Sequence, residues 1–189
     1  PPDGPLLTRA AAVPGDQVAV TGSLGCSAGG FRMLTENLEF DDQTSTHLSR
    51  AHNRPIPRIA EGLALAANGV VAAIDISDGL VDDLGKLCKS SGVGAVVRTD
   101  KVPADRHLKR AFPDEWQALA LGGGEEYELL FIAPEEIMDR AIASLELPCT
   151  VIGEIVVGPE RVKVVDQNGK EIPVDQSGWD HFQHKQPPS

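Results

Sequence analysis

The apolar positions of the chain follow two spacings, one typical of strands and one typical of helices. Residues 70–76 (VVAAIDI) form a nearly continuous apolar run, which predicts a strand that is covered on both faces. The next apolar residues recur at i, i+4, i+7 and i+8, the spacing of one helix face: Leu80, Leu84, Leu87 and Cys88. Gly92 is the expected end of this helix. These segments predict a strand followed directly by an amphipathic helix.

The same patterns predict further short elements on both sides of this pair. Strands are expected at residues 17–21, 94–99, 128–133, 150–155 and 161–165. Helices are expected at residues 31–38 with Ser27 as N-cap, within the polar segment 39–54, and at 59–67, 105–112, 114–121 and 134–145. The pair Asn168-Gly169 predicts a hairpin turn. The mixed order of elements predicts an α+β fold, a mixed β-sheet flanked by helices.

The length of the chain, 189 residues, is sufficient for one domain with a substantial core. Residues 1–16, rich in Pro, Gly and Ala, are expected to be a leading segment, residues 17–182 a single α+β domain and residues 183–189 a tail. No apolar run approaches the roughly 20 residues that span a bilayer. The first residues also contain no signal-peptide core. The sequence therefore predicts a soluble protein without a membrane partner.

The charge balance limits the partners further. Lys and Arg number 17 and Asp and Glu number 28, which gives a net charge of −11. Nucleic acids and anionic membranes require a basic surface, so neither is an expected partner. A phosphate ligand would need a metal ion or backbone N–H groups beside it. The cysteines are odd in number and widely spaced, which fits neither a disulfide framework nor a cysteine zinc site and predicts a reducing cytoplasm: Cys26, Cys88 and Cys149.

The segment Asp75-Ile76-Ser77-Asp78-Gly79 is the first candidate for chemistry. Asp75 ends the apolar strand and Asp78 begins the following helix, so two carboxylates meet at a sheet edge where ligands often bind. Carboxylate oxygens are the ligands that Mg²⁺ prefers. Alternatively, Ser77 is only an N-cap and Asp78 only a charge that favours the helix dipole. That alternative does not explain Asp75, and both interpretations stay open.

Two glycine-rich segments and one tryptophan are further candidates. Residues 122–124 are three glycines followed by Glu125, which is typical either of a ligand loop or of a helix end with a turn. Residues 22–30 (GSLGCSAGG) resemble a phosphate cradle in type but match neither established phosphate-binding motif, and a tight turn with close helix packing explains them equally well. Trp179 could stack on a flat heterocycle or simply close the core. His181 and His184 have the H-x-x-H spacing, but a pair in the tail without a third ligand is weak evidence for a metal site.

Six segments, in this order, resemble the thiamine-monophosphate kinase family: PGDQVAVTGSLGCSAGGF, PIPRIAEGLALA, AAIDISDGLVDDLGKLCKSSGVGA, LGGGEEYELLF, VIGEI and GWDHF. The resemblance extends from about residue 7 to residue 182, and DISDGLVDDL and GGGEEYELLF are its most specific parts. Gly122 and Glu126 stand where the family usually has Ser and Asp. Gly29-Gly30-Phe31 stands where it usually has Ala-Gly-Leu.

The resemblance implies an ATP-dependent phosphotransferase. Such an enzyme transfers the γ-phosphoryl group of ATP to thiamine monophosphate, gives thiamine diphosphate, and relies on positioning and Mg²⁺ rather than on a catalytic acid or base. The resemblance implies that Asp75 and Asp78 bind Mg²⁺, that Ser77 contacts ATP, and that Glu125 and Trp179 contact the substrate.

The resemblance also implies the carboxyl-terminal domain of the aminoimidazole ribonucleotide synthetase-like architecture. An amino-terminal ATP-binding domain would precede it, the full-length enzyme would be a homodimer, and the 189-residue chain alone would be inactive. Two alternatives stay open: another ATP-dependent enzyme of this superfamily, such as a selenophosphate or aminoimidazole ribonucleotide synthetase, and a non-catalytic binding or dimerisation module. Only the kinase requires the predicted site residues to surround one cavity.

Overall fold

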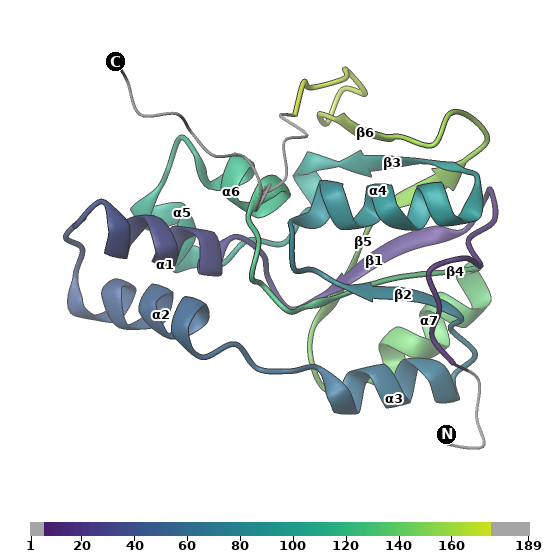
Figure 1. Ribbon diagram of the computed structural model, residues 1–189, viewed down its shortest axis with the longest axis horizontal. Coiled ribbons are helices and arrows are strands. Elements are labelled where there is room, and N and C mark those ends of the chain that lie inside the picture. The colour runs from purple at the N-terminus through teal and green to yellow at the C-terminus, as the bar shows by residue number, and fades with distance from the viewer. Residues whose placement is uncertain (1–5, 175–189) are drawn as a thin grey trace, which may run out of the picture.

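A six-stranded mixed sheet runs through the centre of the computed structural model, which describes residues 6–174 (Figure 1). The strand order is β2-β4-β1-β5-β3-β6, and all neighbours are antiparallel except β3 and β6. The predicted α+β class with a mixed sheet is confirmed. The strands are β1 Gln17–Thr21, β2 Ala72–Asp75, β3 Gly94–Arg98, β4 Leu129–Ala133, β5 Cys149–Val156 and β6 Val162–Val165.

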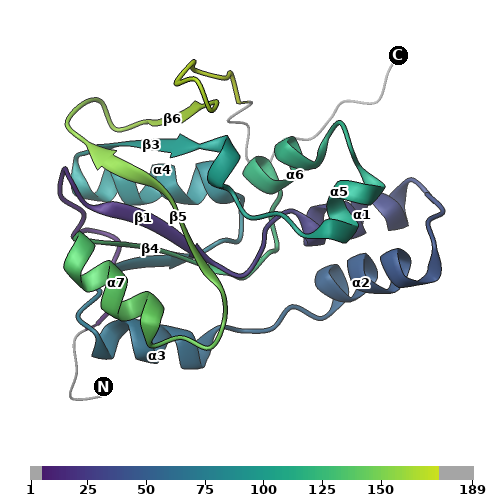
Figure 2. The same ribbon diagram turned by 180° about the vertical axis from the view of Figure 1, so that it is seen from behind.

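Helices cover both faces of this sheet. Helix α4 lies across one face, and α3 and α7 lie on the other (Figures 1 and 2). Within residues 6–174, no helix has the length and apolar character that crossing a membrane requires. The helices are α1 Cys26–Thr35, α2 Asp42–Asn53, α3 Ile59–Ala67, α4 Leu80–Ser91, α5 Arg106–Ala111, α6 Trp116–Gly122 and α7 Glu135–Ala143, with a 3₁₀ turn at Thr99–Lys101.

Strand β1 contributes to the hydrophobic core on each face. Val18 and Val20 pack in the same core as the buried leucines of α4. Ala19 packs instead with Leu65 of α3 and Met138 of α7. Successive side chains of a strand point to opposite faces, so alternation along β1 divides its residues between the two cores.

A group of four helices, α1, α2, α5 and α6, lies beside the sheet and has a core of its own (Figure 1). Helices α1 and α2 approach closely at Gly30, where a Cβ atom would lie 2.2 Å from the carbonyl oxygen of Leu48. Gly25 has a φ of 92°, a conformation that favours glycine. The glycine-rich segment 22–30 therefore makes a tight turn and close helix packing, as one of its two interpretations predicts.

Several elements differ from the sequence predictions. Helix α1 begins at Cys26 rather than at residue 31, so the prediction of Ser27 as its N-cap is wrong. Helix α2 has 12 residues, and the side chain of Asp41 caps it by accepting a hydrogen bond from the Thr44 amide. The turn at residues 166–170 is present, but among the described residues a single bridge, Val165 to Glu171, pairs its arms.

Strand β2 is an edge strand of the sheet and is still buried on both faces, because helices pack on each side and the segment around Thr8 lies along its open edge. The amide of Thr8 donates to the Val71 carbonyl at 2.8 Å, and the Ala73 amide donates to the Thr8 carbonyl at 2.9 Å. The apolar run that predicts β2 thus reflects coverage by helices and not a central position in the sheet.

Candidate active site

Two loops far apart in the sequence meet because β2 and β4 are antiparallel neighbours. Asp75, the last residue of β2, lies opposite Leu129, the first residue of β4. Hydrogen bonds continue from the strands into the loops: the Ile76 amide donates to the Glu128 carbonyl at 2.8 Å, and the Tyr127 amide donates to the Ile76 carbonyl at 2.9 Å. The loop with the DISDG motif and the loop with three glycines are therefore held together by backbone pairing.

Glycine permits the two loops to approach this closely. The amide of Glu125 donates to the carbonyl of Ser77 at 2.8 Å. A Cβ atom on Gly124 would lie 2.6 Å from that same carbonyl oxygen, and one on Gly79 would lie 2.8 Å from the Gly122 carbonyl oxygen. A Cβ atom on Gly122 itself meets nothing within 4 Å. The serine that the related family usually has at residue 122 would therefore fit sterically.

Asp83 holds the loop that carries Ser77 and Asp78. Its side chain is fully buried, and Oδ2 accepts hydrogen bonds from the Ser77 and Asp78 amides, each at 2.9 Å. Oδ1 accepts a 2.7 Å hydrogen bond from Lys86, which also forms an ion pair with Asp78. The sequence analysis missed both residues. Asp83 sits at i+3 from Leu80, a charged residue inside the apolar face of α4, and that position was the available signal.

Three carboxylates gather around Tyr127. The Tyr127 hydroxyl donates to Glu125 at 2.9 Å. That hydrogen bond is the main cause that raises the pKa of Tyr127, and the negative charges of Glu125, Asp75 and Asp78 raise it further. Glu125 and Tyr127 have φ values of 61° and 53°, so the loop between the glycines and β4 is strained. Negative charge is thus concentrated beside the paired loops.

A cavity of about 330 Å³ opens next to these loops. Ser77, Asp78, Gly124 and Glu125 line one side of it. The opposite side comes from the helical group, and the sequence analysis assigned none of these residues to the site: Ala28, Phe31, Arg32, His52 and Leu119. Asp75 is exposed at the strand end and does not line this cavity.

Glu126 occupies the amino-terminal end of α1. Its Oε1 accepts hydrogen bonds from the amides of Ser27 at 3.1 Å and Ala28 at 3.4 Å. Burial raises the pKa of Glu126 to about 8, while the backbone hydrogen bonds from Ala28, Ser27 and Gly25 oppose that rise. A side chain about 100 residues away therefore caps this helix. Because the carboxylate takes the amides that a phosphate would need, the phosphate-cradle interpretation of residues 22–30 is not supported.

A buried ion pair fixes the position of the second loop. Arg58 donates to both carboxylate oxygens of Glu128, at 2.6 and 2.8 Å. Thr21 donates its hydroxyl to the same carboxylate at 2.5 Å and accepts the Leu129 amide at 2.8 Å. Bidentate pairs of this kind are geometrically specific. The connector before α3, the end of β1 and the start of β4 are therefore joined at one point.

The structure brings together four of the five predicted site residues. Asp75, Ser77, Asp78 and Glu125 lie on the paired loops. Trp179 lies outside the described residues 6–174, so its predicted contact with the substrate stays a prediction. Lys86 forms an ion pair with Asp78, and the sequence analysis did not assign this lysine to the site.

The chemistry of this donor set fits Mg²⁺. Among residues 6–174, the Asp75 carboxylate makes no hydrogen bond or ion pair, and it stands near the charges of Asp78 and Glu125. Oxygen ligands of this kind suit a hard cation that keeps part of its shell for water and phosphate oxygens. Lys86 already neutralises Asp78, so a metal ion would share that carboxylate with the ammonium group.

Comparisons with known proteins relate this chain to a family. The thiamine-monophosphate kinase of Salmonella typhimurium (strain LT2) is 43% identical over 187 residues, which cover 96% of this chain and 57% of the relative. That of Escherichia coli (strain K12) is 41% identical over 189 residues, with the same coverage. The chain therefore spans somewhat more than half the length of the curated relatives it matches.

Solved structures agree with these relatives. The thiamine-monophosphate kinase from Stenotrophomonas maltophilia K279a superposes with a TM-score of 0.77 at 34% identity, over 88% of this chain and 54% of that one. AaThiL complexed with AMPPCP and TMP also gives 0.77 at 34% identity, over 93% of this chain and 54% of that one. Residues 13–166 match the family described as AIR synthase related protein, C-terminal domain. The chain belongs to the AIR synthase related protein family and contains its C-terminal domain.

Proposed function

We propose that this chain is the carboxyl-terminal part of a kinase that transfers the γ-phosphoryl group of ATP to thiamine monophosphate. The observation that carries the proposal is that Ser77, Asp78 and Glu125 line one cavity at two paired loops, with Asp75 at the end of the adjoining strand β2. The similarity to thiamine-monophosphate kinases, one of them complexed with AMPPCP and TMP, supports it. The other superfamily enzymes and the non-catalytic module are not favoured.

Each site residue has a role in this proposal. Asp75 and Asp78 hold Mg²⁺, which neutralises charge on the phosphates, Ser77 contacts ATP, and Glu125 contacts thiamine monophosphate. Phosphoryl transfer depends mainly on positioning and charge neutralisation, so no side chain is needed as acid or base. Trp179 is proposed to stack on the thiamine moiety, as the resemblance implies.

The backbone of the site supports positioning. Asp83 holds the loop that carries Ser77 and Asp78, the Glu125–Ser77 hydrogen bond joins this loop to the second one, and the Arg58–Glu128 pair anchors the start of β4. Effective positioning of reacting groups contributes a large part of such catalysis. A site on backbone-paired loops is therefore suited to align a phosphate donor with a phosphate acceptor.

The working enzyme in this proposal is longer than the chain. As the family resemblance implies, an amino-terminal domain would supply further ATP and metal ligands, and the whole enzyme would be a homodimer with sites between domains. A reducing, cytoplasmic compartment suits the three cysteines, all of which are free. Light scattering on the whole enzyme tests the dimer.

The experiment that tests the function uses the whole enzyme. It is incubated with ATP, Mg²⁺ and thiamine monophosphate, and thiamine diphosphate is measured by chromatography. Unphosphorylated thiamine serves as the matched acceptor, because it shares the ring system and lacks the phosphate that must accept the transferred group. Transfer to thiamine would give thiamine monophosphate, so the chromatography measures both phosphorylated products. We expect thiamine diphosphate from thiamine monophosphate and no phosphorylation of thiamine.

A Glu125→Gln variant separates binding from transfer. If Glu125 contacts the acceptor, the KM for thiamine monophosphate rises and the KM for ATP does not. Absence of thiamine diphosphate from the wild-type enzyme at saturating substrates would overturn the proposed activity. An unchanged KM in the variant would remove only the role assigned to Glu125.

A further inference from the structure

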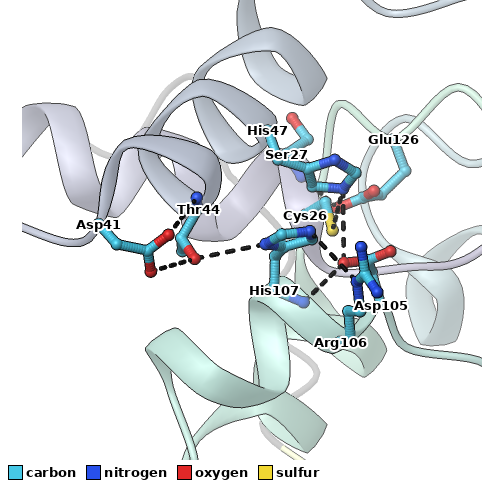
Figure 3. A network of polar contacts seen from close by, with 9 residues as sticks. All are labelled: Cys26, Ser27, Asp41, Thr44, His47, Asp105, Arg106, His107 and Glu126. Carbon is cyan, nitrogen blue, oxygen red and sulfur yellow. Dashed lines mark hydrogen bonds and ion pairs between the residues drawn. The ribbon is translucent and has the colours of Figure 1, made fainter.

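Three side chains with different ligand atoms point to one position beside the helical group, outside the candidate active site (Figure 3). They are the thiol of Cys26 at the start of α1, the imidazole of His47 in α2, and the carboxylate of Asp105 just before α5. Their ligand atoms all lie within 4.8 Å of one another. Proximity of this kind, from three separate elements, is what a metal site requires.

The two contacts of His47 within this group are long for hydrogen bonds. Nε2 of His47 lies 3.8 Å from Cys26 Sγ and 3.5 Å from the Asp105 carboxylate oxygen. A single ring N–H cannot donate well to both. A Cys–His–Asp nucleophile would also place its thiol and its carboxylate on different ring nitrogens, so the arrangement does not fit covalent catalysis.

Two of the three distances between the ligand atoms suit a small tetrahedral ion. With bonds of about 2.3 Å to sulfur and about 2.0–2.2 Å to nitrogen or oxygen, tetrahedral zinc separates its ligand atoms by roughly 3.3–3.6 Å. The observed distances of 3.8 and 3.5 Å are close to this range. A set of one sulfur, one nitrogen and one oxygen atom also favours zinc over the hard cation Mg²⁺.

Neighbouring side chains hold His47 in place. The ring of His107 stacks on the ring of His47, with centroids 4.7 Å apart. His107 is itself fixed, because Nδ1 lies 3.3 Å from the Thr44 hydroxyl and Nε2 accepts a hydrogen bond from Arg106 at 3.4 Å. Both nitrogens of His107 are thus engaged, so His107 orients His47 and is not a ligand itself.

The position is accessible from solvent. Cys26 and His47 line a cavity of about 400 Å³, together with Arg50 and Arg54. His47 is exposed, whereas Cys26 is buried. An ion can therefore enter from the cavity, and a water molecule or small anion from the cavity can complete its coordination.

We infer that Cys26, His47 and Asp105 bind one Zn²⁺ ion, with the fourth position open to the cavity. The ion joins α1, α2 and the start of α5, three elements that the sequence brings together only in the folded state. The cysteine spacing predicts no zinc site because a single cysteine takes part. This inference does not depend on the proposed kinase activity.

Metal binding to the purified chain tests the inference. Zn²⁺ affinity is measured by competition with a chromophoric chelator, in excess Mg²⁺ so that the carboxylates of the candidate active site are saturated. We expect one tight Zn²⁺ per chain and a rise in melting temperature. Cobalt(II) in place of zinc gives an absorption band from the cobalt–thiolate bond, which reports sulfur coordination directly.

Variants distinguish Zn²⁺ binding at this site from binding through other side chains of the chain. Cys26→Ser and His47→Gln are expected to weaken Zn²⁺ binding at least tenfold and to abolish or shift the thiolate band. Cys149→Ser, which removes another free thiol, should leave both signals unchanged. His47 is exposed, so its variant is expected to fold, and circular dichroism checks this. Binding through His181 and His184 would produce no thiolate band.

Two results would overturn the inference. One is equal Zn²⁺ affinity in the wild type and the His47→Gln variant. The other is a wild-type cobalt complex without a thiolate band, or a band that disappears in Cys149→Ser and not in Cys26→Ser.

Discussion

Asp83 is a buried acid whose partners are two backbone amides and one lysine. Replacement by alanine leaves the Ser77 and Asp78 amides without an acceptor, which costs about 2–4 kcal/mol of the free energy of unfolding. We expect Asp83→Ala to show this loss in urea unfolding. Asp82→Ala is the matched control, because Asp82 is the adjacent acid of α4 and makes none of these hydrogen bonds. Equal losses in the two variants would contradict the role of Asp83.

Glu126 makes the stability of the fold depend on pH. Its pKa is about 8 in the folded state, raised from the ordinary value of 4.5 mainly by burial. Between these values the folded state holds more protons at this site than the unfolded state, so the stability contributed here is present at low pH and is lost as the pH rises through 8.

The Glu126→Gln variant isolates this contribution because the amide cannot titrate. From pH 5 to pH 8 in buffer containing EDTA, we expect the wild type to lose about 1–3 kcal/mol more stability than the variant, after solvent screening is allowed for. Chemical unfolding at each pH measures the difference. Glu136→Gln, a change at an exposed helix position, should follow the wild type. Parallel curves for wild type and Glu126→Gln would refute the prediction.

Among the candidate site residues, Asp75 has the side chain that is expected to contribute least to the stability of the fold. It is exposed, and among residues 6–174 its side chain makes no hydrogen bond. In the whole enzyme, Asp75→Asn is therefore expected to lower turnover roughly 100-fold and to raise the Mg²⁺ requirement, with melting temperature almost unchanged. Rates at limiting and saturating Mg²⁺ measure this. Wild-type rates at limiting Mg²⁺ would show that Asp75 does not hold the metal.

At the scale of elements, the site depends on how closely the two loops pack. A Cβ atom on Gly124 would lie 2.6 Å from the Ser77 carbonyl oxygen, so Gly124→Ala must push the loops apart and weaken the Glu125–Ser77 hydrogen bond. We expect a loss of about 1–3 kcal/mol in unfolding free energy and a lower turnover of the whole enzyme.

Gly122→Ala is the control for this change. A Cβ atom there meets nothing within 4 Å, so the variant should keep its stability within about 0.5 kcal/mol. If both alanine variants behave alike, close packing of the loops does not limit the site.

At the scale of the whole molecule, the chain has about half the length of its relatives and a net charge of −11. The candidate site offers Lys86 and Arg32 as cations, and both already pair with acids: Lys86 with Asp78 and Asp83, Arg32 with Glu36 and Glu115. A nucleoside triphosphate therefore finds little unpaired positive charge at the candidate site within residues 6–174.

We expect the purified 189-residue chain to form no detectable thiamine diphosphate from ATP and thiamine monophosphate. Misplacing reacting groups by about 1 Å can cost around a hundredfold in rate, and absence of further ligands costs more. The assay is run beside calorimetric titration with Mg-ATP. Turnover near that of a full-length relative, or micromolar Mg-ATP binding, would contradict this expectation.

The sequence by itself determined the types of most elements and the loops that carry the carboxylates. The apolar run before Asp75 and the helical spacing after Gly79 depend on neighbouring residues alone, so local pattern was sufficient to predict β2 and α4. The motifs were also sufficient to indicate the family, since their residues and their order along the chain can be read from the sequence without knowledge of the fold.

Only the tertiary structure decided which of these residues meet. The register of β2 against β4 places Ser77 beside Glu125, the cap of α1 comes from Glu126, and the Cys26–His47–Asp105 group joins three elements. Each contact joins residues that are about 20 to 100 positions apart in the sequence. The pattern of neighbouring residues cannot predict contacts between positions so far apart. Strand register and helix packing determine which residues make these contacts, because a shift of a single residue in register would turn the side chains of a strand to the opposite face.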